Sequence, residues 1–333
     1  MIVRESYPSR ITRRNVLGLG AGLVAGLCGD VAFAQAYPAK PIRIIVGFVP
    51  GGSTDFGARM ISAGLADALG VPVVVENKPG ATGVIASEYV AGAPPDGYTL
   101  LVGTATPIII APQAMGRQSF NALKDLTAVN MVAESPMALA VNPGLGVKRV
   151  KDLVALSRTR PVTVGTSGLG GTLHLLVESL IQSTGGNFVV VPYKGSGPTI
   201  TDTIAGHIDA TVSDVGSFLP FHNDGKLLML GIASEKRMDV LPNVPTLQED
   251  VPGLVMVSWT GLFAPAKTPK PIIDTLNAGL MKMIARDDVR KQFIKSGATV
   301  YAQPDPAAFQ KLVATDYQRF GKLIKERGIV IKD

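Results

Sequence analysis

The sequence predicts an α/β protein of two lobes that are joined by a hinge. Short apolar runs alternate with helical patterns, which is typical of a parallel sheet covered by helices. This alternation restarts after Asn142-Pro143-Gly144, and the chain becomes mainly helical after Pro265. The last helices are too few to form a domain, so we expect them to return to the first lobe. The chain then crosses between the lobes twice, which gives a hinge and a cleft that closes on a ligand.

The N-terminus has the pattern of a cleaved export signal. Arginines precede the apolar stretch Val16–Leu27, and the small-residue segment Ala32–Ala36 follows it. We therefore expect residues 1–35 to be removed and the protein to reside in the periplasm. Thr12–Leu17 resembles a twin-arginine motif without matching every position. The single cysteine, Cys28, lies inside this signal, and we expect it to be discarded.

The first lobe is predicted to comprise residues 36–139 and 261–333. Each strand is an apolar run, and each helix has apolar residues at helical spacing. The predicted strands are Ile42–Val46, Val73–Glu76 and Thr99–Gly103, and the predicted helices are Ala58–Leu69, Val84–Ala91, Pro271–Ile284, Asp287–Ser296 and Pro306–Glu326.

The second lobe is predicted to comprise residues 140–260 and repeats the same alternation. Its predicted helices are Lys151–Ser157, Thr172–Thr184 and Thr199–Ala205, and its strands are Val162–Gly165, Phe188–Val191, Ala210–Ser213 and Leu228–Ala233. Prolines mark an irregular stretch before the chain returns near Ser258–Phe263.

Composition excludes several classes of function. Without Cys28 the chain has no cysteine, which rules out disulfides, thiolate catalysis and cysteine-bound metal. The formal net charge is +6, but Lys and Arg are scattered without aromatic interleaving, so no nucleic-acid partner is expected. The three histidines lack metal-ligand spacing. We expect no metal and no cofactor.

A glycine turn, Val49–Asp55, ends the first strand and opens a helix. The free N–H groups of the helix start and the positive end of its dipole favour a carboxylate or a phosphate. Gly47 and Gly52 have the spacing of a phosphate-binding loop, but Ser53 replaces the required Lys, so nucleotide hydrolysis is not expected. The alternative is an ordinary strand-to-helix turn. Asp55 and Arg59 are predicted to pair along the helix, and Asp55 is able to orient the turn.

A second glycine turn, Thr166–His174, repeats this pattern in the other lobe. If both helix starts face the cleft, they hold one anion from two sides without a buried Arg. Gly103–Thr106 and Tyr193–Pro198, rich in hydroxyls and backbone donors, are further candidates for the cleft wall. Asp214 either accepts a hydrogen bond from a ligand or water, or caps a helix.

Three other side chains have two interpretations each. Trp259 and Tyr193 either form an aromatic wall or pack at the lobe junction, and for Trp259 we prefer the junction. Lys194 either neutralises a second carboxylate or is solvated. His174 is interpreted as a hydrogen-bonding residue at its helix start.

A hydrolase is the alternative from another class of function. Ser167, His174 and Asp214 are the residue types of a catalytic triad. Leu169 stands where the Gly-x-Ser-x-Gly elbow requires its second glycine, so the local pattern does not support this interpretation.

The chain resembles the Bug or TctC family, the extracytoplasmic solute receptors of tripartite tricarboxylate transporters. Several ordered motifs carry the resemblance, namely Tyr37–Arg43, Gly47–Asp55, Val74–Gly83, Pro95–Leu101, Val191–Pro198, Leu241–Leu247 and Ser258–Pro265. The chain departs from the family at Phe48–Pro50, which barely alters a backbone clamp, and at Ala105–Pro107, which changes the wall.

The resemblance implies a monomeric, two-lobed periplasmic binding protein fold of type II-like topology, without catalysis. It implies capture of a small carboxylate or related organic anion, and delivery to the membrane components of a transporter. A role in signalling alone is the further alternative. The residues predicted to bind the ligand are Val49, Gly51, Gly52, Ser53, Thr54, Asp55, Thr104, Thr106, Thr166, Ser167, Gly171, Thr172, His174, Gly195, Ser196 and Asp214.

Overall fold

The computed structural model describes residue 2 and residues 37–331, apart from residues 52, 118, 194, 296–297 and 302–304. The chain divides into two units, Met1–Ala39 and Lys40–Asp333, and nearly all described residues belong to the second unit. The predicted export signal, except Ile2, lies outside the described residues. Within the described ranges, no helix is both long enough and apolar enough to span a membrane.

The first lobe of the Lys40–Asp333 unit is built on a parallel sheet. β1 (Ile42–Val46) pairs with β2 (Val73–Asn77) on one side and with β3 (Thr99–Thr104) on the other. β9 (Val257–Pro265) then joins β3 in antiparallel orientation. The helices of this lobe are α2 (Ser53–Leu69), α3 (Val84–Ala91), α4 (Ala111–Ala114), α5 (Ala122–Asp125), α10 (Lys270–Ile284), α11 (Asp287–Lys295) and α12 (Pro306–Arg327).

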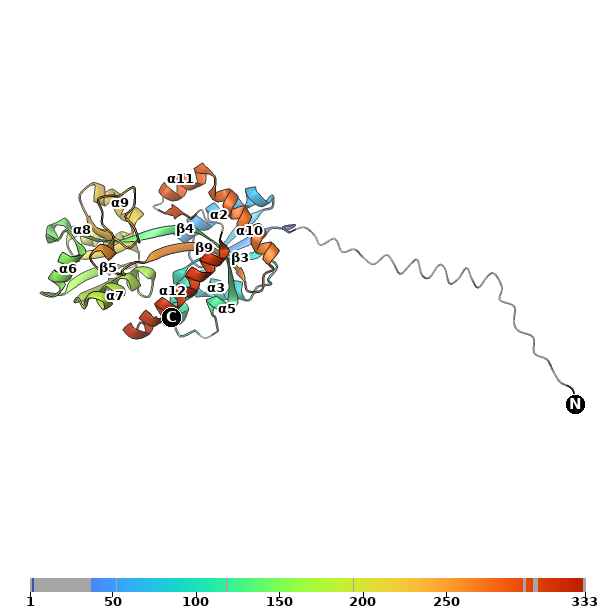
Figure 1. The fold of residues 1–333 in the computed structure, drawn as a ribbon, viewed down its shortest axis with the longest axis horizontal. Coiled ribbons are helices and arrows are strands. Elements are labelled where there is room, and N and C mark those ends of the chain that lie inside the picture. Colours follow the sequence, from blue (N-terminus) through green and yellow to red (C-terminus); the bar gives the residue numbers. More distant parts are fainter. Residues whose placement is uncertain are drawn as a thin grey trace. The chain divides into compact units, whose positions relative to one another are not determined.

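The second lobe has its own parallel strands. β5 (Val162–Thr166) lies between β6 (Phe188–Pro192) and β7 (Ala210–Asp214). Figure 1 shows the four helices of this lobe gathered around these strands. These helices are α6 (Val150–Ser157), α7 (Thr172–Thr184), α8 (Ser196–Ala205) and α9 (Val215–Asn223).

The long strand β4 (Leu126–Val141) is shared by both lobes. Its first part pairs with β9, whereas Met137–Val141 pairs with β7 and, over Ala138–Val141, with β8 (Leu228–Ile232). The two-residue strand β10 (Thr299–Val300) also pairs with β4. β4 and β9 run between the two groups of helices in Figure 1, and together they form the hinge. The predicted fold class, two α/β lobes with two crossovers, is confirmed. The residue boundaries of the lobes remain predictions.

Most predicted elements are present, with two instructive differences. α7 begins and ends at the predicted residues, whereas α2 begins at Ser53 rather than at the predicted Ala58, so Thr54 and Asp55 are already helical. The length of β4 was not predicted, because a long apolar run without alternation does not reveal a strand that is buried on both faces.

Trp259 packs at the base of the hinge, as preferred from the sequence. It is 1% exposed, and its ring meets Phe309 edge-on at 5.2 Å between centroids and Phe263 at 5.9 Å. The indole Nε1 donates to Asp316 Oδ2 of α12 over 2.9 Å. This packing ties β9 to α12.

Candidate functional site

The first glycine turn, Val49–Asp55, is closed by a carboxylate at the start of its own helix. Asp55, the third residue of α2, accepts a hydrogen bond from the Gly51 N–H at 2.9 Å. Gly51 has φ 89°, a conformation that glycine adopts without strain. Asn77 links the two ends of the turn, because its Nδ2 donates to Phe48 O at 3.0 Å and to Asp55 Oδ1 at 2.9 Å.

Asp55 is ionised at neutral pH. Its side chain is buried, and it accepts from Arg59 Nε at 2.9 Å and from Arg59 Nη2 at 3.2 Å. The hydrogen bond from Arg59, with those from Gly51 and Asn77, lowers the pKa of Asp55 to about 2. The predicted pair along the helix is therefore present, and it also orients the turn.

The second glycine turn, Thr166–His174, is closed by an imidazole in the corresponding place. His174 is the third residue of α7, and its Nδ1 accepts from the Gly170 N–H at 2.9 Å. Gly170 has φ 71°. Thr166 is fully buried, and its hydroxyl donates to Gly168 O at 2.8 Å. The buried side chain of Thr166 therefore stabilises the conformation of the turn.

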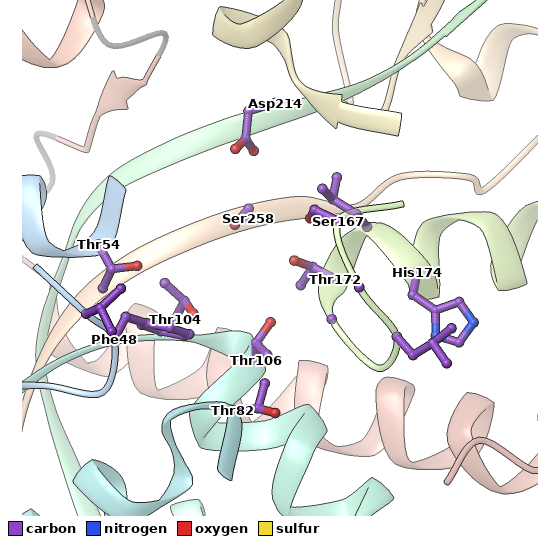
Figure 2. Close-up of a pocket in the computed structure, with 15 residues that line it drawn as sticks. Phe48, Thr54, Thr82, Thr104, Thr106, Ser167, Thr172, His174, Asp214 and Ser258 are labelled. Atoms are coloured by element: carbon purple, nitrogen blue, oxygen red, sulfur yellow. The ribbon is translucent and has the colours of Figure 1, made fainter. Parts of the chain in front are cut away.

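A pocket of about 400 Å³ lies between the two turns, a volume within the usual range for small-molecule sites. In Figure 2 the hydroxyls of Thr54, Thr106 and Thr172 and the carboxylate of Asp214 point toward this common space. Nine residues predicted from the sequence line it, namely Val49, Thr54, Thr104, Thr106, Ser167, Gly171, Thr172, His174 and Asp214.

The remaining predicted residues have other positions. Gly51, Asp55, Thr166, Gly195 and Ser196 are not among the residues that line the pocket. Gly52, the side chain of Ser53, and Lys194 lie outside the described part of the chain.

Tyr193 does not line the pocket, and its hydroxyl is hydrogen-bonded to another side chain. Its hydroxyl donates to Asp202 at 2.7 Å, which raises the pKa of Tyr193 to about 12.

Six lining residues were not predicted from the sequence, namely Phe48, Thr82, Gly168, Leu169, Leu173 and Ser258. Two of them lie in motifs that carry the family resemblance, Val74–Gly83 and Ser258–Pro265, but only the fold brings these residues to the pocket. Thr82 lies in the motif Val74–Gly83 and has φ 54°, a rare conformation for threonine that marks a constrained turn. Ser258 precedes the buried Trp259 on β9, and alternation along a strand places it on the opposite face.

Among the residues that the structure describes, the pocket lining contains no Lys or Arg. The N-termini of α2 and α7 contribute residues to this lining, and the first N–H groups of a helix have no acceptor within the helix. Thr106 adds a hydroxyl from a π-helical turn, Thr106–Ile110, a feature that is frequent at functional sites. The described part of the lining thus offers neutral hydrogen-bond donors to an anion.

Asp214 is the one acidic side chain among the described residues that line the pocket. It precedes α9, yet its side chain makes no capping hydrogen bond. Burial raises the pKa of Asp214 to about 6. The carboxyl group therefore changes its charge close to neutral pH, inside the pocket.

The triad expected of a hydrolase is not assembled. His174 uses Nδ1 to accept from Gly170, and its Nε2 lies 3.3 Å from Glu178 Oε1. Figure 2 shows the imidazole turned away from Ser167. Both ring nitrogens are engaged, so His174 does not activate Ser167 as a general base in this arrangement.

The chain matches the family described as tripartite tricarboxylate transporter family receptor over residues 57–329. It is 36% identical to Protein BugT of Bordetella pertussis over 313 residues, which cover 92% of this chain and 95% of that protein. A structure of an R. palustris protein with adipate is 32% identical, with TM-score 0.75 and coverage of 88% of this chain and 99% of that chain. MatC from Rhodopseudomonas palustris with bound malate is 31% identical, with TM-score 0.73 and coverage of 86% and 100%.

The family match covers most of both lobes and the whole second glycine turn, and it begins two residues after the end of the first turn at Asp55. The family match covers well over half of the chain, and the fold agrees with that of solved relatives of similar length. The chain therefore belongs to the family of tripartite tricarboxylate transporter receptors.

Proposed function

We propose that this protein is a periplasmic solute-binding receptor that captures a small carboxylate between its two glycine turns. The observation that carries the proposal is a pocket whose described residues include the starts of two helices and several hydroxyl groups but no Lys or Arg. Neutral donors from both sides satisfy a carboxylate without the desolvation cost of a buried ion pair. Two solved relatives were obtained with malate and with adipate, which are small dicarboxylates.

Capture also requires closure of the lobes. One helix terminus contributes about 0.3 to 2 kcal/mol to anion binding, whereas micromolar affinity requires roughly 8 kcal/mol. Val49 and Leu169, 63% and 54% exposed, belong to opposite turns and line the pocket. Closure on a ligand buries these two apolar side chains and excludes water, which supplies part of the difference.

Asp214 sets a requirement on the ligand. When ionised, it repels a second ligand carboxylate; when protonated, it donates a hydrogen bond to one. A hydroxyl or amine on the ligand instead donates to the ionised form. Binding of a plain dicarboxylate such as adipate therefore weakens as the pH rises through about 6, the pKa of Asp214.

Family membership supports delivery of the ligand to the membrane components of a tripartite transporter. We propose that the protein acts as a monomer, without catalysis, and that it releases its ligand to that transporter. The test is uptake of radiolabelled ligand by cells that contain the matching permease. Deletion of the receptor gene should abolish uptake; unchanged uptake would contradict delivery.

The capture step is tested on protein exported by its own signal and purified from the periplasm. Malate, adipate, citrate, acidic amino acids and aromatic acids are screened by thermal shift, since a ligand that binds only the folded state raises its apparent stability. Stabilisation by a narrow set of carboxylates supports the proposal. Stabilisation by sugars or esters alone would contradict it.

A further inference from the structure

Support for the second glycine turn extends beyond its own helix. Because Nδ1 of His174 accepts from Gly170, the ring proton is on Nε2 and is directed at Glu178, one turn further along α7. Glu178 Oε2 in turn accepts from Arg327 Nε at 2.6 Å. Arg327 is the last residue of α12. Three side chains thus connect the backbone of the turn to the C-terminal helix.

Each oxygen of Glu178 has a separate donor. Oε1 faces His174 and Oε2 faces Arg327. The hydrogen bond from His174, with that from Arg327, outweighs burial and lowers the pKa of Glu178 below its ordinary value. The exposed fractions of the two side chains are 13% for Glu178 and 34% for Arg327, so the ion pair is partly shielded from solvent.

The segment that follows α12 contacts the same turn independently. A Cβ atom built on Gly170 would lie 2.1 Å from Ile331 Cδ1, so Ile331 packs directly on the glycine. The backbone N–H of Ile331 donates to Ala114 O of α4, in the first lobe, at 3.1 Å. Ile331 therefore lies between the first lobe and the second glycine turn.

α12 is itself anchored to the hinge. Asp316 accepts from Trp259 of β9, and Arg319 Nη1 donates to Val255 O at 2.9 Å. A second link to α7 is the hydrogen bond from Gln182 Nε2 to Glu326 Oε2 at 2.7 Å. The C-terminal helix is thus held at the hinge near its middle and is linked to the second glycine turn at its C-terminal end.

We propose that Glu178, Arg327 and Ile331 are positioning residues that hold the second glycine turn in its ligand-binding geometry through His174 and Gly170. This proposal rests on the proposed function of the pocket. None of the three lines the pocket, so they act through the turn rather than on the ligand. The C-terminal helix of the first lobe thereby determines how well a turn of the second lobe binds its carboxylate.

The test compares variants of the exported, full chain by titration calorimetry with the carboxylate that binds the wild type best. Glu178→Gln leaves one acceptor oxygen for two donors, and Arg327→Gln removes the charge. Each should weaken affinity about tenfold, the effect of losing a hydrogen bond to a charged group. Arg327→Lys should restore most of the affinity. Ile331→Ala should weaken affinity less, because the hydrogen bonds remain.

Gln182→Ala is the matched control. It removes the other hydrogen bond between α7 and α12 but leaves His174 and its partners intact, so its affinity should equal that of the wild type. Equal losses in Gln182→Ala and Arg327→Gln would mean that general helix docking, rather than positioning of the turn, is responsible, and would overturn the proposal.

A second measurement does not depend on ligand. Nitrogen-15 spectra of the imidazole rings report which ring nitrogen carries the proton, and His174 is one of only three histidines. The wild type should show the Nε2–H form at His174, and Glu178→Leu, which leaves this N–H without its acceptor, should shift the spectrum toward a mixture. An unchanged spectrum would overturn the proposal, whereas a wild type that binds no carboxylate would instead overturn the proposed function.

Discussion

In the first glycine turn a carboxylate accepts the Gly51 N–H, and in the second an imidazole accepts the Gly170 N–H. In both turns the acceptor is the third residue of the helix, and the donor is the glycine four residues earlier. Both acceptors also have a partner one helical turn further on, Arg59 or Glu178. The hydrogen-bond arrangement is the same, although the residue types differ.

The two turns differ in what supports the acceptor. Asp55 is satisfied by residues of its own lobe, including Arg59 and Asn77. His174 depends on Glu178 and, through it, on Arg327 at the end of α12. The first turn is therefore a local structure with a buried charge. The second turn is responsive to the position of a distant helix, and the predictions below follow from this difference.

The largest effect on stability is expected for Asp55→Ala. This substitution leaves the N–H groups of Gly51 and Asn77 without their buried acceptor, which should cost about 3 kcal/mol of unfolding free energy. Denaturant unfolding measures the change. His174→Ala should lower the free energy of unfolding less, because the acceptor that is lost is an imidazole and not a carboxylate. Equal losses in the two variants would contradict the view that the charged acceptor stabilises its turn more.

Substitution of the two glycines should separate backbone strain from packing. Alanine at Gly51 meets no atom within 4 Å, so Gly51→Ala should cost only about 1 kcal/mol for its positive φ. Gly170→Ala also displaces Ile331 and should cost about 2 kcal/mol in thermal or denaturant unfolding. The double variant Gly170→Ala with Ile331→Ala should recover part of that loss. No recovery would mean that Ile331 does not pack on the turn.

Acid should weaken the first turn in a defined pH range. The pKa of Asp55 is lowered to about 2, so its stabilising contribution is complete above the pKa of the unfolded chain, near 4, and is lost as the pH falls toward 2. Allowing for screening at the exposed Arg59, the contribution is about 1.5 kcal/mol. Unfolding of the wild type and of Asp55→Asn, measured from pH 5 to pH 2, should converge at the acid end. Parallel curves would contradict this assignment.

The smallest effect is expected for Arg59→Gln. Arg59 is 55% exposed, and an exposed ion pair contributes little to stability. Ligand affinity should also stay close to that of the wild type, because Gly51 and Asn77 still hold Asp55. A loss as large as that of Arg327→Gln would show that both turns depend equally on their outer partners.

The sequence predicted the two turns well because their determinants are local. Strand, glycine turn and helix start are adjacent along the chain, so α7 and the pocket positions of Thr54, Ser167 and Thr172 followed from short-range patterns. The roles of Asp55 and Arg59 followed from their spacing. Thr82 and Ser258 were not identified as lining residues, because only the fold brings them to the pocket.

The side chains that hold His174 in place could not be predicted from local sequence patterns either. Arg327 lies 149 residues from Glu178, and no spacing rule connects them. The long strand β4 was not predicted either, since its pairing with β9, β7 and β8 depends on segments far along the chain. Glycine turns and helix starts can be predicted from adjacent residues, whereas strand pairing and contacts between the lobes cannot.

The most direct test of carboxylate capture is calorimetric titration of the wild type with adipate and with its neutral analogue adipamide, at pH 5 and at pH 8. Adipate should bind and adipamide should not, because only a carboxylate uses the N–H groups of both turns. Adipate should bind more weakly at pH 8, where Asp214 is ionised, and Asp214→Asn should reduce that dependence to the part that comes from protonation of adipate itself. Equal binding of adipate and adipamide, or no binding of adipate, malate or any other carboxylate at either pH, would contradict the account.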